Sequence, residues 1–142
     1  MGKPIKLDIK PDFDFTLIGL VTSEQLYRVS WLINELLNIH LKETPPLQVY
    51  HTKRQIVQEF PKFCFCSDSD SCFYLIGNKS QQGFLIEEQK QVDYWIKVEG
   101  LLFESNDLTD KLKGLKNINL AFEVKPGSLK SKSRLLFSEE ND

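Results

Sequence analysis

The sequence predicts an α+β fold: a two-layer sandwich in which two helices pack on one face of a largely antiparallel sheet of about five to six strands. Two observations lead to this class. Apolar residues recur at helical spacing in only two segments, whereas several others are continuously apolar or alternate apolar with polar residues. Short polar turns join consecutive strand-like segments, which favours antiparallel pairing.

The N-terminal part predicts a strand followed by a helix. Residues 15–20 form a largely apolar run that suits a strand covered on at least one face, with an irregular edge around Pro11 before it. The helix is the clearest element of the chain. The residues on its apolar face are Leu26, Val29, Ile33, Leu36 and Leu37. Thr22 and Gln25 match a capping box, so the helix is expected to start at Thr22 as N-cap.

Tyr27 and Trp31 widen the apolar arc of this helix beyond what one sheet contact needs. One interpretation is that the helix lies flat in a groove of the sheet. The other is that Trp31 faces a second subunit, which makes Tyr27 and Trp31 a candidate interface for a homodimer.

The middle of the chain is rich in strands. Residues 43–46, with two prolines, end the first helix. Strands are then expected at residues 47–50, 55–66, 72–77 and 84–86. Residues 67–71 are small and polar, which is typical of a hairpin loop, and residues 78–83 form a second polar turn.

The last third predicts a strand, a helix and a strand. Residues 92–98 alternate strictly, with Tyr94 on the apolar side, and the strand ends at Gly100. The second helix is marked by Leu108, Leu112 and Leu115, with Asn106 or Asp107 as its cap. Residues 118–124 alternate again. We therefore assign residues 1–126 to a single α+β domain and residues 127–142 to a C-terminal tail that is partly disordered.

Composition narrows the possible functions. The chain has 142 residues, of which 41% are hydrophobic and 27% charged, as in one globular domain. Its net charge of −2 argues against attraction of the whole surface to nucleic acid or anionic lipid. No apolar run reaches the ~18–20 residues of a membrane helix. Three cysteines, and charges in place of an N-terminal signal segment, predict a reducing, cytoplasmic location.

Residues 86–94 read Ile-Glu-Glu-Gln-Lys-Gln-Val-Asp-Tyr. This run resembles the signature that names the IPExxxVDY family of small bacterial proteins, although Glu87 stands where the family has proline. Other segments that resemble the family are Asp12–Phe15, Tyr27-Arg28 with Trp31, Tyr74–Ile76 with Asn78-Lys79, and Leu129–Lys132. The resemblance implies a cytosolic bacterial protein and no particular activity.

The motif supplies the candidate functional residues Ile86, Glu88, Val92, Asp93 and Tyr94. Without the proline, the strand before Glu87 is free to run one residue further. Tyr94 is expected on the core side with its hydroxyl at the rim, while Asp93 faces outward or accepts bonds from the turn at residues 89–91. Two interpretations stay open. The motif is a turn held by a carboxylate, or a shallow polar site formed by Glu88, Asp93 and Tyr94 in which Glu88 and Asp93 act as acid and base.

Cys64, Cys66 and Cys72 suggest a metal site, because Cys64 and Cys66 share a strand face and Cys72 returns across the hairpin. A fourth ligand would be His51 or Asp68. Cys-x-Cys is not the usual zinc spacing, however, so we expect buried thiols and no metal or other cofactor. A Cys66–Cys72 cross-link is an alternative under oxidising conditions.

Three functions remain as hypotheses. The first is a non-catalytic protein-interaction or regulatory domain that dimerises through the Trp31 flank or an edge strand. The second is an RNA-associated protein that uses Lys130, Lys132 and Arg134 with a sheet face, although the overall charge disfavours nucleic acid. The third is a small enzyme with an acidic site at Glu88 and Asp93. Neither a nucleophile with its base nor a glycine-rich phosphate loop is recognisable.

Overall fold

The elements of the fold come from a computed structural model, which describes residues 14–67, 71–100 and 105–137. The strands are β1 (Thr16–Val21), β2 (Lys42–His51), β3 (Ile56–Cys66), β4 (Cys72–Gly77), β5 (Lys79–Ser80), β6 (Gly83–Phe84), β7 (Tyr94–Glu99) and β8 (Leu120–Val124). The helices are α2 (Leu26–Leu37) and α3 (Ser105–Lys113), and the 3-10 turns are η1 (Pro126–Ser128) and η2 (Lys132–Leu135). None of the described helices is long and apolar enough to cross a membrane.

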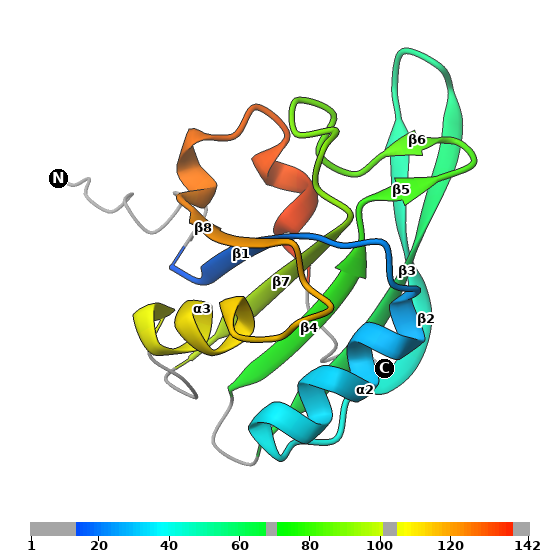
Figure 1. Cartoon of the computed structure of the whole chain (residues 1–142). Helices are drawn as coiled ribbons and strands as arrows, with labels where there is room; N and C mark the ends of the chain where they lie inside the picture. Colours follow the sequence, from blue (N-terminus) through cyan, green and yellow to red (C-terminus); the bar gives the residue numbers. More distant parts are fainter. Residues whose placement is uncertain (1–13, 68–70, 101–104, 138–142) are drawn as a thin grey trace, which may run out of the picture.

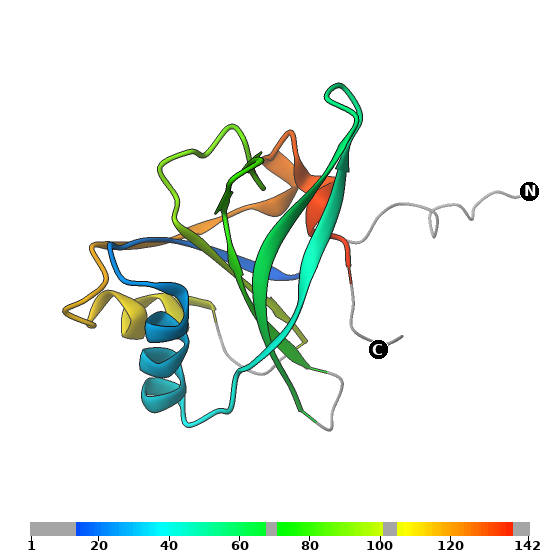
Figure 2. The same cartoon turned by 90° about the vertical axis from the view of Figure 1, so that its right-hand side faces the viewer.

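One six-stranded antiparallel sheet dominates the structure, with the strand order β2-β3-β4-β7-β1-β8 (Figure 1). The short strands β5 and β6 form a separate antiparallel pair. Both helices lie on one side of the large sheet, as Figure 2 shows. Their apolar faces and that side of the sheet share one core, with the members Ile18, Leu20, Val29, Ile33, Phe73, Leu75, Ile96, Val98, Leu108 and Leu112. The predicted α+β class is confirmed.

The opposite face of the sheet is buried as well. Its core combines strand residues with residues from irregular segments: Leu17, Phe60, Tyr74, Ile76, Trp95, Leu85, Ile86, Val92, Leu129 and Leu135. β1 and β4 are therefore apolar on both faces, which explains why they show little alternation. β7 alternates in sequence, but Trp95 and Lys97 on its second face are 0% and 1% exposed.

The C-terminal segment (residues 126–137) forms much of this second layer. The sequence predicts a partly disordered tail from residue 127, yet Leu129 and Leu135 are 5% and 0% exposed. Phe137 packs edge-on against Tyr74, with 4.9 Å between the ring centroids. In Figure 2 the segment lies across the sheet from the helices. Residues 127–137 of the predicted tail are therefore packed on the sheet, whereas its end lies outside the described residues.

The helix start also differs from the prediction. α2 begins at Leu26 with Gln25 as N-cap, and Thr22 does not cap it. The Thr22 hydroxyl instead donates to the carbonyl oxygen of Asn117 at 2.6 Å and accepts from the Glu24 amide at 3.1 Å. Thr22 thus joins the end of β1 to the chain before β8. The helix ends at Asn38, which is left-handed (φ 58°) and donates its amide proton to the Asn34 carbonyl oxygen.

Several strand boundaries are wrong in the prediction. β2 starts at Lys42 and passes through both prolines, with a register shift between Thr44 and Leu47. It is an edge strand, where a missing amide proton costs no ladder bond. Other boundaries differ as well: β6 stops at Phe84, β7 starts at Tyr94, α3 starts at Ser105 and β8 starts at Leu120, while β1 is shifted by one residue and β3 starts one residue later. The edge near Pro11, Asp68 and residues 138–142 lie outside the described residues.

Two adjacent leucines test whether the C-terminal segment belongs to the core. Leu135 is fully buried, whereas Leu136 is 41% exposed. We expect Leu135→Ala to lower the free energy of unfolding by about 2–5 kcal/mol, because it leaves a cavity beneath the sheet. Leu136→Ala should change it by about 0.5 kcal/mol or less. Urea denaturation of both variants measures this. Equal small effects would mean that the segment does not contribute to the core.

Candidate functional site

Asn78, the residue after β4, organises the motif predicted from sequence. Its side chain is 0% exposed. The Oδ1 atom accepts from the Ile86 amide and from Trp95 Nε1, both at 2.9 Å. The Nδ2 atom donates to the carbonyl oxygens of Gln89 and Val92, also at 2.9 Å. These four bonds use the full capacity of the amide.

The backbone of Asn78 fixes the same segment, which we call the motif loop (residues 85–93). The Asn78 amide donates to the Asp93 carbonyl oxygen at 3.0 Å, and the Leu85 amide donates to the Asn78 carbonyl oxygen at 2.8 Å. The Asp93 amide donates to the Leu20 carbonyl oxygen at 2.8 Å. One end of the motif loop is therefore attached to the residue that follows β4, and the other end is attached to β1. The expected strand extension at Glu87 does not occur. β6 ends at Phe84, and Leu85 and Ile86 pack into the core on the second face of the sheet without strand pairing.

Asp93 and Tyr94 connect the motif loop to the start of α2. The Asp93 carboxylate accepts from the Thr22 amide at 2.9 Å and from Lys79 Nζ at 2.7 Å. The expected partners in the turn at residues 89–91 are thus replaced by others. Tyr94 packs against the helix-side core as predicted, and its hydroxyl donates to the Glu24 carbonyl oxygen at 2.6 Å. Burial, with the negative charges of Asp93 and Glu24, raises the pKa of Tyr94.

Glu88 connects the motif loop to the C-terminal segment. Its carboxylate accepts from the Ser131 amide and from the Ser131 hydroxyl, both at 2.9 Å. Partial burial works to raise the pKa of Glu88, but the hydrogen bonds from Ser131 and from the backbone outweigh it and hold the pKa below its ordinary value. Glu88 and Asp93 therefore stabilise different junctions. The structure does not bring them together as an acid and a base.

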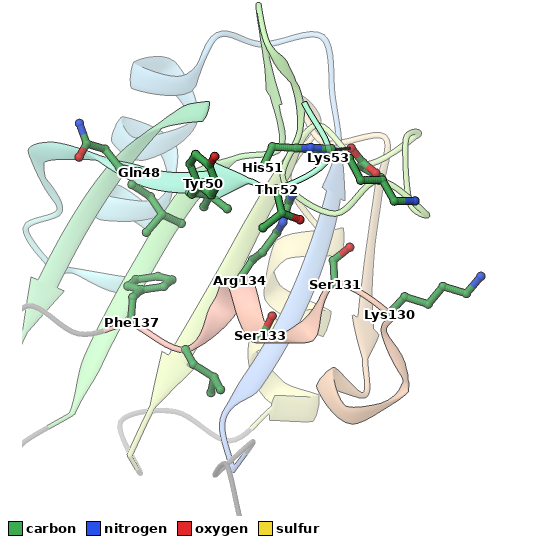
Figure 3. Close-up of a pocket in the computed structure, with 14 residues that line it drawn as sticks. Gln48, Tyr50, His51, Thr52, Lys53, Lys130, Ser131, Ser133, Arg134 and Phe137 are labelled. Atoms are coloured by element: carbon green, nitrogen blue, oxygen red, sulfur yellow. Dashed lines mark hydrogen bonds and ion pairs between the residues drawn. The ribbon is translucent and has the colours of Figure 1, made fainter. Parts of the chain in front are cut away.

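An open groove of about 800 Å³ lies between β2 and the C-terminal segment (Figure 3). Residues 47–53 form one wall, and Glu87 stands at the groove as well. The other wall consists of Lys130, Ser131, Ser133, Arg134, Leu136 and Phe137. A second cavity of about 530 Å³ shares Glu87 and Lys130 and adds Arg54, Phe84, Glu88 and Lys90. Because they share these two residues, the two cavities are adjacent, and we call them together the β2 groove.

The β2 groove is basic, although the whole chain carries a net charge of −2. Its cationic side chains are Lys53, Arg54, Lys90, Lys130 and Arg134, and its carboxylates are Glu87 and Glu88. The groove thus has a formal excess of positive charge even with His51 neutral. His51 is held in place, since its Nε2 lies 3.3 Å from Glu87 Oε2 and its Nδ1 accepts from the Arg54 amide at 3.2 Å.

Arg134 is positioned by the motif loop. Its Nη1 donates to the carbonyl oxygens of Phe84 and Leu85 at 3.0 and 2.9 Å, and Figure 3 shows the side chain extending toward the β2 wall. Lys130 is exposed and lines both cavities. Lys132 instead donates to the Gly127 carbonyl oxygen at 3.2 Å and lines neither. Two of the three basic residues predicted from sequence therefore meet in the groove.

Tyr27 and Trp31 lie on the outer side of α2, 68% and 50% exposed. The Arg28 guanidinium lies 4.8 Å from the Trp31 ring centroid. The interpretation that the helix lies flat in a groove of the sheet is therefore wrong for these two side chains. Their role as an interface stays a prediction.

The cysteines do not form the buried thiols that the sequence suggested. Cys66 and Cys72 are joined by a disulfide, Cys66 is exposed, and Cys64 keeps its thiol. In the part of the chain that the structure describes, no group of three or more potential ligand side chains could hold a metal ion. The expected neighbour His51 belongs to the β2 groove, whereas His40 is the histidine that lines a cavity with Cys64 and Cys66.

Comparison with models of known protein families gives no match, and no curated protein is significantly similar to the chain. The function must therefore be argued from the geometry of the site.

Asn78 provides the sharpest test of the site. Asn78→Ala leaves two carbonyl oxygens, an amide and an indole N–H without their partner in a buried position. We expect a loss of about 3–5 kcal/mol in the free energy of unfolding. Asn119→Ala, at an exposed position before β8, serves as the control and should cost about 0.5 kcal/mol or less. Similar losses in the two variants would contradict this role of Asn78.

Glu88 predicts a specific pH dependence. Because its pKa is lowered in the folded protein, its contribution to stability is present above the unfolded pKa and is lost as the pH falls through the folded pKa. Glu88→Gln should therefore flatten the decline in urea midpoint below about pH 5. Glu123→Gln, at an exposed site on β8, should keep the wild-type profile. An unchanged profile for Glu88→Gln would show that the contact with Ser131 is not maintained in solution.

Proposed function

We propose that the protein is a protein-interaction domain that binds an acidic, extended segment of a partner protein along β2. The observation that carries this proposal is the position of the β2 groove beside an edge strand. β2 pairs with β3 and has no other strand neighbour among the described residues. Free backbone groups of such a strand bind extended peptides by adding a strand to the sheet.

The charge of the groove supports an acidic occupant. Its cations come from three separate parts of the chain: the turn after β2 (Lys53, Arg54), the motif loop (Lys90) and the C-terminal segment (Lys130, Arg134). Complementary charge speeds encounter and disfavours the wrong partners. Glutamate or aspartate side chains on an extended segment would meet this basic surface.

The apolar residues of the groove support an alternating sequence. Tyr50 is 58% exposed and Leu136 is 41% exposed, and both line the groove together with Phe137. Successive side chains of an extended segment point to opposite sides. A partner segment that alternates apolar and acidic residues would place one set against these side chains and the other set near the cations.

RNA is the less favoured occupant. Glu87 and Glu88 interrupt the basic surface, and the net charge of the chain is negative. Single-stranded nucleic acid also needs successive aromatic platforms. Of the aromatic side chains in the groove, Tyr50 is the one that is more than half exposed.

A synthetic peptide that alternates valine with glutamate tests the proposal by fluorescence anisotropy. We expect micromolar binding, and the combined variant Lys53→Glu/Lys130→Glu should weaken it by about tenfold or more, equivalent to about 1.4 kcal/mol. The control Lys113→Glu/Lys116→Glu changes the net charge equally at exposed positions outside the groove and should bind as the wild type does. A peptide that alternates valine with lysine should not bind.

Two results would contradict the proposal. The first is tighter, salt-dependent binding of oligouridine that the groove variant abolishes, which would favour the RNA-associated function. The second is a set of amide NMR shifts on peptide addition that avoids residues 47–53 and clusters on the outer side of α2. That pattern would place the interface at Tyr27 and Trp31.

A further inference from the structure

The three cysteines lie together at the end of the β3–β4 hairpin. Cys66 and Cys72 are register partners with 4.1 Å between their Cα atoms, and they form the disulfide. Cys64 lies two residues earlier on β3 and therefore on the same face. Its Sγ is 3.6 Å from Cys66 Sγ. A thiol thus lies next to a disulfide of which one half, Cys66, is exposed.

We propose that Cys64, Cys66 and Cys72 form a thiol–disulfide exchange site for an anionic low-molecular-weight thiol. This function is independent of the peptide-binding function, because it uses the hairpin end and the start of β2. The residues that would take part line a cavity of about 550 Å³: His40, Lys42, Cys64, Phe65 and Cys66. Lys42 is the register partner of Cys64. Its ammonium group would attract an anionic thiol and stabilise a thiolate.

The disulfide lies at a hairpin end that backbone hydrogen bonds already hold closed. The hairpin is already closed by backbone bonds on both sides, with the Phe65–Phe73 pair before the disulfide and the Ser67 amide bonded to the Ser71 carbonyl oxygen at 2.8 Å after it. The bridged cysteines are six residues apart. A loop this short gains less from cross-linking than the long loops of many structural disulfides do. An exposed bridge of this kind is suited to exchange.

The reaction has two balanced steps. In the first, the thiolate of the small molecule attacks Cys66 Sγ. The Cys66–Cys72 bond breaks, Cys72 leaves as a thiolate that takes a proton from water, and a mixed disulfide forms on Cys66. In the second, Cys64 loses its proton to water and attacks Cys66 Sγ. The small thiolate leaves, and a Cys64–Cys66 disulfide remains beside the Cys72 thiol. No net oxidation occurs.

The second pairing is the less stable one. Residues two apart on an extended strand are separated by about 6.6–6.8 Å at Cα, which is at the upper limit for a disulfide. The Cys72 thiol can therefore lose its proton to water and attack Cys66 Sγ, which restores the original pair, and Cys64 leaves as a thiolate that takes a proton from water. Cys64 acts as the resolving thiol, and it shortens the lifetime of the mixed disulfide.

Reduced glutathione is the probe, and intact-mass spectrometry after acid quenching is the measurement. With oxidised glutathione as a second probe, the Cys64→Ser/Cys72→Ser double variant should accumulate the Cys66 mixed disulfide about tenfold or more above Cys72→Ser, because in Cys72→Ser the intramolecular Cys64 thiol displaces glutathione at a high effective concentration. Cys64→Ala/Cys72→Ser should behave as Cys64→Ser/Cys72→Ser does, and near-UV circular dichroism confirms that each variant is folded. Peptide mapping of the wild type should reveal a minor Cys64–Cys66 pairing. Cysteamine, a cationic thiol, should react more slowly than glutathione.

The Cys72→Ser variant is the matched control, since it has no Cys66–Cys72 disulfide for reduced glutathione to attack and should form no adduct. Equal levels of the Cys66 mixed disulfide in Cys72→Ser and in the two double variants after treatment with oxidised glutathione would overturn the resolving role of Cys64. An intact Cys66–Cys72 disulfide with no adduct in any variant would overturn the exchange site. Neither result affects the peptide-binding proposal, which rests on the β2 groove.

Discussion

The buried amide of Asn78 is the interaction on which most of the structure's second layer depends. In a protein interior each unpaired polar group is costly, so an amide with four partners specifies one arrangement of the chain around it. Those partners run from Ile86 to Trp95. Leu85, Ile86 and Val92 are held against the sheet as a result, and they form a large part of its second core.

The effect of Asn78 extends to the β2 groove through two contacts. The fixed motif loop presents the carbonyl oxygens of Phe84 and Leu85 to Arg134, and it presents the Glu88 carboxylate to Ser131. These contacts hold the C-terminal segment alongside β2. The shape of the groove therefore depends on how the layers pack. β2 forms one wall, and the C-terminal segment, which is bonded to the motif loop, forms the other.

Regular apolar patterns in the sequence predicted strands and helices, but they gave no information on segments that lack such a pattern. Residues 72–77 were expected as a strand and form one to the residue, because a continuous apolar run between polar turns has few alternatives. The C-terminal segment has no period, and its two buried leucines, Leu129 and Leu135, are surrounded by polar residues. Only the tertiary structure shows that they are core.

Buried polar residues could not be predicted from the sequence either, because they occupy positions where an exposed polar residue is expected. Lys97 occupies the polar phase of β7, yet its Nζ lies 4.0 Å from the Phe137 ring centroid, 3.1 Å from the Phe137 carbonyl oxygen and 2.9 Å from Glu99 Oε2. Burial lowers the pKa of Lys97, and Glu99 opposes that effect. A lysine with such partners is indistinguishable in sequence from one exposed to solvent. The basic pairs at residues 53–54 and 130–134 were visible in the sequence, but their convergence was not.

The edge strand β2 is protected against pairing along only part of its length. An unprotected edge invites pairing with any extended chain, and proteins limit this with proline, charge and irregular register. The first half of β2 has all three, in Lys42, in Pro45-Pro46 and in the register shift that ends at Leu47. The second half, residues 47–51, is regularly paired and borders the basic groove. The proposed strand addition would therefore be confined to this short second half of β2, beside the basic residues that we expect to favour acidic sequences.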